Sequence, residues 1–309
     1  MLTQPHFLSI SDYSARELRV LLDTADDMKR HPKAYRDALQ GKVLAMIFEK
    51  SSTRTRVSFE TGIFQMGGIG QFLSSRDIQI GRGEPIYDTA AVLSRFVDGI
   101  MARTFAHQTV TDLAKYGTVP VINGLTDLEH PCQIMADLQT VRENFGKLEG
   151  LKFVYIGDGN NMAHSYMQGT GKTGMHCTIV TPKDAKYACN AAIISGAQAD
   201  HAAQGTTLTI TDDPAAGIAG AHVVATDTWV SMGMEEEKAE RLKAFKGFTV
   251  DKALMAQADK DAIFIHCLPA YRGYEVTEDV IDGPQSRIYD EAENRLHAQK
   301  AIMFHLMGR

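Results

Sequence analysis

VLAMIF at residues 43–48 and LKFVYI at residues 151–156 are continuous apolar runs. Apolar runs of this length are typical of strands buried on both faces of a parallel sheet. Each run is followed by a polar turn and then by a stretch with helical spacing, at 53–66 and 161–168. The two runs therefore predict two strand–turn–helix units in different parts of the chain.

The same alternation of strand and helix extends over most of the chain. Further strands are expected at 99–102, 119–122, 178–180, 208–210, 223–225 and 262–266. Further helices are expected at 11–29, with Ser11 or Asp12 as its cap, and at 133–145, 184–199 and 291–307. This order favours the α/β class, with two domains that are each a parallel sheet flanked by helices. A length of 309 residues also suits two domains.

Composition disfavours several classes of protein. With 32 basic and 38 acidic residues the net charge is −6, whereas a general nucleic-acid binder is more often basic. The apolar runs are far shorter than the ~18 residues of a membrane span, and MLTQPHFLSI lacks the features of a signal peptide. Four cysteines without CxxC pairing favour reduced thiols in the cytoplasm. We expect no nucleic acid and no membrane as partner.

Two glycine-rich segments resemble nucleotide-binding motifs only in part. GTGKT at 169–173 lacks the first glycine of a P-loop, because Tyr166 stands there, and it is interpreted as a helix-ending loop. Gly157-Asp158-Gly159 follows a strand, but the third glycine of a dinucleotide fingerprint falls on Met162. No HExxH motif or His/Asp cluster has metal spacing. The sequence therefore predicts no cofactor and no metal.

Residues 49–56, EKSSTRTR, place hydroxyls and arginines at a predicted helix N-terminus. Free backbone N–H groups, hydroxyls and a guanidinium together suit a phosphate. Arg54 and Arg56 are two residues apart and point to different helix faces, so at most one is expected to meet the anion squarely. The alternative is a Ser/Thr cap with solvated arginines.

Other polar residues follow strands or begin helices, where ligands bind in open α/β sheets. Arg103 suits an oxygen atom, His130 suits a carbonyl, and Asp227 suits an ammonium group; each is also explained by an exposed or capping role. Cys267 ends a strand, although a lone buried cysteine is usually inert. Because a strand alternates its faces, His266 is expected to point away from Cys267, which argues against a Cys–His dyad.

Five segments together resemble the aspartate/ornithine carbamoyltransferase family. They are STRTR at 52–56, MART at 101–104, HPCQ at 130–133, DTWVSMG at 227–233 and HCLP at 266–269. The resemblance implies transfer of the carbamoyl group from carbamoyl phosphate to the δ-amine of L-ornithine, giving L-citrulline and phosphate in arginine metabolism; synthesis and breakdown of arginine use the same chemistry and both stay open. It also implies an active site in the cleft between the domains.

The resemblance assigns roles residue by residue. The implied catalytic residues are Arg103, His130 and Cys267. Carbamoyl phosphate would be bound by Ser52, Thr53, Arg54, Thr55, Gln79, Arg103, His130, Gln133, Cys267, Leu268 and Arg295. Ornithine would be bound by Asn161, Asp227, Ser231 and Met232. Without the resemblance, Asn161 is equally an N-cap and Gln133 an ordinary helix glutamine.

The resemblance further implies the domain roles and the assembly. Residues 1–146 would bind carbamoyl phosphate, residues 147–290 would bind ornithine, and the closing helix at 291–309 would pack back on the first domain. The expected assembly is a homo-oligomer, a trimer in which Gln79 reaches a neighbouring site.

Two alternatives stay open. One is a sister transferase that uses aspartate, putrescine or an acylated ornithine, against which the SMG and HCLP segments argue. The other is a non-catalytic homologue, which would be expected to lack a phosphate ligand, whereas Ser52 to Thr55 and Arg103 are all present.

Overall fold

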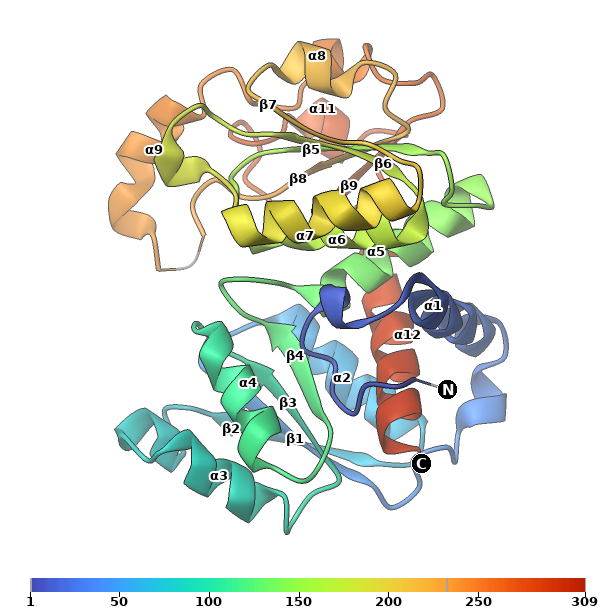
Figure 1. Ribbon diagram of the computed structural model, residues 1–309, viewed down its shortest axis with the longest axis vertical. Helices are drawn as coiled ribbons and strands as arrows, with labels where there is room; N and C mark the ends of the chain where they lie inside the picture. Colours follow the sequence, from blue (N-terminus) through green and yellow to red (C-terminus); the bar gives the residue numbers. More distant parts are fainter. Residues whose placement is uncertain (1, 232, 309) are drawn as a thin grey trace. The chain divides into compact units, whose positions relative to one another are not determined.

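The computed structural model describes residues 2–231 and 233–308, which divide into two compact units (Figure 1). The first unit comprises the chain up to Gln139 and from Glu293 onward; the second comprises residues 140–292. Each unit contains one parallel sheet flanked by helices, which confirms the predicted α/β class with two domains. The functional domain limits expected after residues 146 and 290 stay a prediction.

The first unit has a sheet of strand order β2-β1-β3-β4 in which all pairings are parallel. Its strands are β1 (Val43–Phe48), β2 (Ile69–Ser74), β3 (Gly99–Arg103) and β4 (Val121–Leu125). Its helices are η1 (Ile10–Asp12), α1 (Ala15–Arg30), η2 (Pro32–Tyr35), α2 (Thr53–Gln65), η3 (Gln79–Arg82), α3 (Ile86–Leu93), α4 (His107–Tyr116), and parts of α5 (Pro131–Phe145) and α12 (Ile288–Met307).

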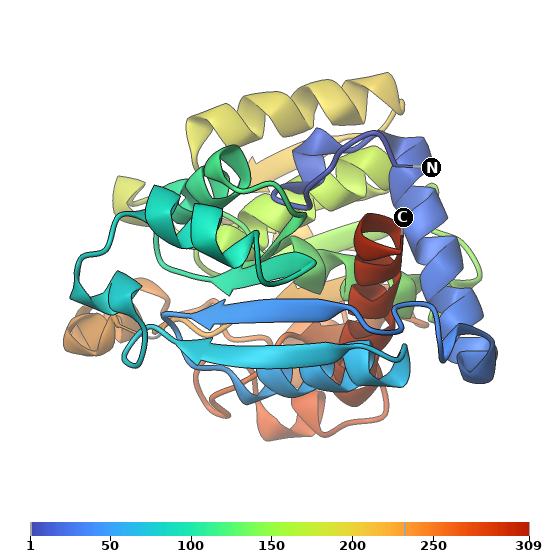
Figure 2. The same cartoon turned by 90° about the horizontal axis from the view of Figure 1, so that it is seen from below.

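The strand order places a switch point between β1 and β3. The chain runs from β1 to β2 on one side and then crosses to β3 and β4 on the other. Accordingly, α2 lies on one face of the sheet and α3 and α4 lie on the other (Figure 2). Phe48 pairs with Arg103, so the two strands end at the same level. Ligands of open α/β sheets bind at such a point, beyond the carboxyl ends of the strands.

Helices α2 and α12 pack closely within the first unit (Figures 1 and 2). A Cβ atom at Gly62 of α2 would stand 3.0 Å from Cε of Met303 and 3.1 Å from Cγ of Lys300, both on α12. The glycine therefore permits the close approach of the two helices. As a result, polar side chains of α12 reach the N-terminal turns of α2.

The second unit has the strand order β7-β6-β5-β8-β9, again with parallel pairings. Its strands are β5 (Lys152–Ile156), β6 (His176–Val180), β7 (Leu208–Thr211), β8 (Val223–Thr226) and β9 (Ile263–His266). Its helices, besides the ends of α5 and α12, are α6 (Asn161–Thr173), η4 (Ala185–Tyr187), α7 (Ala191–Ala203), α8 (Pro214–Ile218), η5 (Glu235–Glu237), α9 (Lys238–Ala244), α10 (Lys252–Met255) and α11 (Glu278–Ile281).

The switch point of this second sheet lies between β5 and β8. Helices α6 and α7 lie on one face of the sheet, and α8 and α11 lie on the other (Figure 1). Thr226 pairs with Ile156 on one side and with His266 on the other, so β5, β8 and β9 end together. The residues just beyond these three strands are therefore neighbours.

The GTGKT segment at 169–173 is not the helix-ending loop that the sequence predicts, because α6 continues through it to Thr173. Its glycines have a packing reason. A Cβ atom at Gly171 would lie 3.0 Å from the ring of His201 on α7. The helix expected at 184–199 is also wrong in its start, since η4 precedes a separate α7 that Asn190 caps.

Other local predictions also differ from the structure. Helix α1 is capped by Ser14, whose side chain and that of Glu17 form a capping box, and not by Ser11 or Asp12. Strand β2 and helix α4 were not predicted from the sequence. Across residues 2–231 and 233–308, none of the helices combines the length and apolar character needed to cross a bilayer.

His201 predicts an acid sensitivity of the fold. Its side chain is buried against α6, and its Nδ1 lies 2.8 Å from Oγ1 of Thr206. Burial lowers the pKa of His201 below its usual 6.5, so protonation favours the unfolded chain. Its stabilising contribution is complete above about pH 6.5 and is lost as the pH falls through the lowered pKa, at up to about 1.4 kcal/mol per pH unit.

We therefore expect His201→Gln to be less stable than the wild type at pH 8 but to lose less stability between pH 7 and pH 5. Urea unfolding at several pH values measures this difference. His31→Gln is the control, because the side chain of His31 is largely exposed, 63%. Parallel pH profiles for the wild type and His201→Gln would contradict the assignment.

Candidate active site

The switch point of the first sheet carries hydroxyls at the start of α2. Ser52 has extended backbone and caps the helix by accepting a hydrogen bond of 3.2 Å from the backbone N–H of Thr55. Thr53 and Arg54 occupy the first turn, and Thr55 is buried. The helix N-terminus carries partial positive charge and so favours an anion beyond it.

Arg295 reaches this turn from α12. Its Nη1 donates to Oε1 of Gln133 at 2.6 Å, and its Nη2 donates to Oγ1 of Thr55 at 3.2 Å. Gln133, in the first turn of α5, in turn donates through Nε2 to Asp137 at 2.8 Å. The structure thus brings together three predicted residues from three helices.

His130 lies within the same positive field. Burial, together with the guanidinium groups of Arg295, Arg103 and Arg54, holds the pKa of His130 well below its usual range. The imidazole is therefore neutral at physiological pH and acts as a hydrogen-bonding group rather than as a cation. Arg103 is the last residue of β3 and is also buried.

Two side chains of this region, Arg56 and Gln79, have other surroundings than the group formed by Thr55, Gln133 and Arg295. The guanidinium of Arg56 stacks over the ring of Phe72 at 3.8 Å and contacts Glu60 at 3.2 Å. That at most one arginine of the STRTR segment meets an anion stays a prediction. Gln79 begins η3, and its side chain is exposed.

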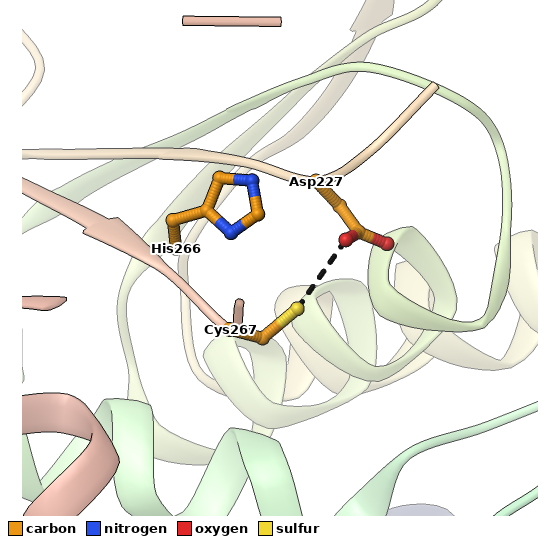
Figure 3. A group of neighbouring side chains, drawn as sticks. All are labelled: Asp227, His266 and Cys267. Atoms are coloured by element: carbon orange, nitrogen blue, oxygen red, sulfur yellow. Dashed lines mark hydrogen bonds between the residues drawn. The ribbon is translucent and has the colours of Figure 1, made fainter. Parts of the chain in front are cut away.

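The switch point of the second sheet carries a buried carboxylate. Asp227 follows β8 and accepts hydrogen bonds from Nδ2 of Asn160 at 2.9 Å and from the N–H of Thr228 at 2.8 Å. The thiol of Cys267 points toward it and donates to Oδ1 at 3.3 Å (Figure 3). A buried carboxylate held in this way suits a cationic ligand.

The prediction that His266 points away from Cys267 is wrong. Donor atoms of Asp227, His266 and Cys267 all lie within 4.8 Å of one another (Figure 3). Alternation of faces ends with β9, and Leu268 has a left-handed backbone, φ 58°, before the cis peptide bond to Pro269. The thiol nevertheless donates to Asp227 and not to the imidazole, so the residues do not form a Cys–His dyad.

Two buried glutamates hold His266, and sequence reasoning missed both. Nδ1 of His266 accepts from the N–H of Leu268 at 2.9 Å, and Nε2 lies 3.3 Å from Oε1 of Glu275. Glu291 accepts from the backbone N–H of His266 at 2.8 Å. These bonds fix the turn that presents Cys267.

The three donor types of this group are also those of transition-metal sites. Each donor already has a protein partner: Asn160 for Asp227, Leu268 and Glu275 for His266, and Asp227 for Cys267. A metal would have to displace these bonds.

The remaining predicted residues lie around this group. Asn160, which sequence reasoning missed, is the N-cap of α6, and Asn161 is the first helical residue with its side chain half-buried. Ser231 is half-buried beyond β8, whereas Met232 lies outside the described residues. Leu268 follows Cys267 and packs against the second unit's core.

A buried ion pair was also missed. Nη1 of Arg241 donates to Oδ2 of Asp158 at 2.6 Å and to the carbonyl oxygen of Trp229 at 3.1 Å. Burial raises the pKa of Asp158 against the opposing effect of Arg241. Arg241 thereby joins α9 to the turn after β5 and to the backbone at Trp229. The only signals in the sequence were an aspartate at the end of a predicted strand, Asp158, and an arginine in a charged helix, Arg241.

Two doubly wound units, one with clustered arginines and the other with a buried carboxylate and thiol, define an α/β enzyme of two substrates, one of them anionic. Models of the aspartate/ornithine carbamoyltransferase family match both parts: its carbamoyl-phosphate binding domain over residues 5–143 and its Asp/Orn binding domain over residues 149–306. The chain belongs to this family.

Similar proteins are named ornithine carbamoyltransferase. That of Oceanobacillus iheyensis is 56% identical, with 98% of this chain and 94% of the relative aligned. That of Thermococcus kodakarensis is 52% identical, over 97% and 96% of the two chains. The structure from Pyrococcus furiosus has a TM-score of 0.94 at 49% identity and covers 98% of this chain and 97% of its own.

Proposed function

We propose that this protein transfers the carbamoyl group of carbamoyl phosphate to the δ-amine of L-ornithine, giving L-citrulline and phosphate. The observation that carries the proposal is the group formed by Arg54, Arg103 and Arg295 around the neutral His130 at the start of α2. It matches an anionic, carbonyl-containing substrate, and relatives at over 50% identity bear the corresponding name.

In the first unit, Ser52, Thr53, Arg54 and Thr55 bind the phosphate, and Arg103 and His130 polarise the carbamoyl oxygen as an oxyanion hole does. In this assignment Gln133, whose Oε1 accepts from Arg295, binds the carbamoyl NH2 group. Since carbamoyl phosphate is already activated, the protein has to orient it and stabilise the charge on its oxygens. The family resemblance adds Cys267 and Leu268, which belong to the second unit, to the proposed ligands of carbamoyl phosphate.

In the second unit, Asp227 holds the ammonium end of ornithine, together with Asn161, Ser231 and Met232. Cys267 lines the place of the δ-amine. Free amines of this kind titrate near ~10, so the amine has to lose a proton before it attacks the carbamoyl carbon. The C–N bond then forms as the bond from carbon to the phosphate oxygen breaks.

A panel of acceptors tests the proposal. Purified protein and carbamoyl phosphate are incubated with ornithine, aspartate, putrescine or N-acetylornithine, and ureido products and phosphate are measured. Citrulline should form at least about 100-fold faster than any other product, because unpaired buried polar groups reject the wrong substrate. Preference for another acceptor identifies a sister transferase, and no turnover with any of them identifies a non-catalytic homologue.

Cys267→Ser should keep measurable activity, with a KM for ornithine raised several-fold and a nearly unchanged KM for carbamoyl phosphate. Serine retains a donor toward Asp227 but alters the fit beside the amine. Cys177→Ser is the control, because Cys177 is a buried thiol of β6. A covalent carbamoyl adduct on Cys267, trapped by mass spectrometry during turnover, would overturn the pocket-lining role.

We further propose a homotrimer that acts in arginine biosynthesis in the cytoplasm. All four cysteines are free thiols, as suits a reducing compartment. Most of the large apolar side chains exposed by the described residues lie on the first unit: Val57, Phe64, Ile69, Tyr87, Val92, Phe96, Phe105 and Tyr116. Exposed apolar surface of this kind favours subunit contact, and the exposed Gln79 is the residue proposed to act in the neighbouring site.

A further inference from the structure

Arg295 belongs to a closed ring of hydrogen bonds between α2 and α12. Besides Thr55, its guanidinium donates to Oε1 of Gln299, from Nε at 3.2 Å and from Nη2 at 2.9 Å. Gln299 lies one helical turn after Arg295, on the same face of α12, and is completely buried. The amide NH2 group of Gln299 donates to Oγ of Ser58 at 2.6 Å.

The hydrogen-bond network assigns the amide orientation of Gln299, in which every bond of the ring has one donor and one acceptor. The hydroxyl of Ser58 donates to the carbonyl oxygen of Thr55 at 3.2 Å, so its oxygen is left to accept from Gln299. The other end of the Gln299 amide then presents its oxygen to Arg295, which has only donors. A ring with fixed donors and acceptors holds a side chain in one orientation.

The acceptors just described for the guanidinium are uncharged. The partners from Thr55, Gln133 and Gln299 are a hydroxyl and two amide oxygens, all neutral. A carboxylate at position 299 would hold Arg295 in a similar place but would cancel its charge at short range. Neutral acceptors orient the guanidinium and keep it attractive to an anion.

We propose that Gln299 and Ser58 are positioning residues that aim Arg295 at carbamoyl phosphate. This inference rests on the proposed function, in which Arg295 belongs to the arginine group that binds carbamoyl phosphate. Neither residue touches substrate in this assignment; they act only through Arg295 and the first turn of α2.

The test compares Gln299→Met with Gln65→Met in steady-state kinetics and in calorimetric binding of carbamoyl phosphate. Methionine fills a similar volume without the acceptor. Gln65 is the matched control, because its Oε1 accepts from Lys300 at 3.0 Å and so also joins α2 to α12, away from Arg295. Gln299→Met should lower kcat/KM for carbamoyl phosphate by about 10- to 100-fold, the value of one charged hydrogen bond, with little change in the KM for ornithine. Gln65→Met should affect only the melting temperature.

Three further variants keep the test decisive if Gln299→Met folds poorly. Ser58→Ala should show a smaller loss of the same kind, and Ser58→Thr should restore it. Gln299→Glu should weaken carbamoyl phosphate binding more than Gln299→Met does, because it adds a negative charge. Wild-type kinetics in the folded variants, or equal effects of Gln65→Met and Gln299→Met, would overturn the positioning role. Absence of turnover and binding in the wild type would instead refute the proposed function.

Discussion

Arg54→Ala should lower kcat/KM for carbamoyl phosphate by about 100- to 10,000-fold, because two charged hydrogen bonds to phosphate are each worth roughly 1.5–3 kcal/mol. Arg54 is half-buried in the first turn of α2, and its charge acts on His130. Alanine has no charged group to replace the guanidinium, and the helix N-terminus alone binds an anion weakly. Steady-state kinetics and calorimetry with carbamoyl phosphate measure the loss, and circular dichroism verifies the fold.

The matched control for this variant is Arg56→Ala. Arg56 has the same side chain two residues along the same helix, but it stacks on Phe72 and pairs with Glu60. We expect it to reduce the free energy of unfolding by about 1 kcal/mol with nearly normal kinetics. Similar kinetic losses in both variants would remove the distinction between a binding and a structural arginine.

The central strands were predictable because their sequences report burial directly. β1 and β5 are apolar at nearly every position, as strands covered on both faces have to be. β2 lies at the sheet edge, contains Gly70 and Gln71, and is only partly buried, so its sequence carries no such signal. The short α9, α10 and α11 are likewise held by packing rather than by periodicity.

The site was predictable only to the level of strand ends. The rule that ligands bind beyond the carboxyl ends of strands selects Arg103, Asp227 and Cys267. It does not select Arg295, which bonds to Gln133 and Thr55 across 162 and 240 residues of chain, and which only the family resemblance supplied. The expected opposite orientation of His266 and Cys267 was wrong, because Cys267 follows the last residue of β9 and periodicity holds only inside the strand.

A mixing experiment with Gln79 and Arg54 tests the proposed trimer. If Gln79 acts across the subunit interface, Gln79→Ala leaves each subunit with its own Arg54, and Arg54→Ala leaves each subunit able to supply Gln79 to its neighbour. Each variant alone contains only defective sites. In mixed trimers some sites combine an intact Arg54 with an intact Gln79, while others carry both defects.

Each site of the closed trimer takes Arg54 from one subunit and Gln79 from its neighbour. When the two variants are mixed at random in equal amounts, both residues should be intact in about one quarter of the sites. Activity should therefore rise from the low level of either variant alone to roughly a quarter of the wild-type activity. The rate of this rise is set by the rate of subunit exchange. Arg54→Ala mixed with Thr53→Ala is the control, because both side chains lie in the same turn of the same subunit. If Thr53 also acts within its own subunit, every site in these mixed trimers carries one of the two defects. No intact site should then form, and activity should stay low. Light scattering first verifies the trimer, and native mass spectrometry verifies that trimers are mixed. Mixed trimers without recovery would mean that Gln79 serves its own subunit or has no role in binding, since only a residue acting in the neighbouring site can be complemented in this way.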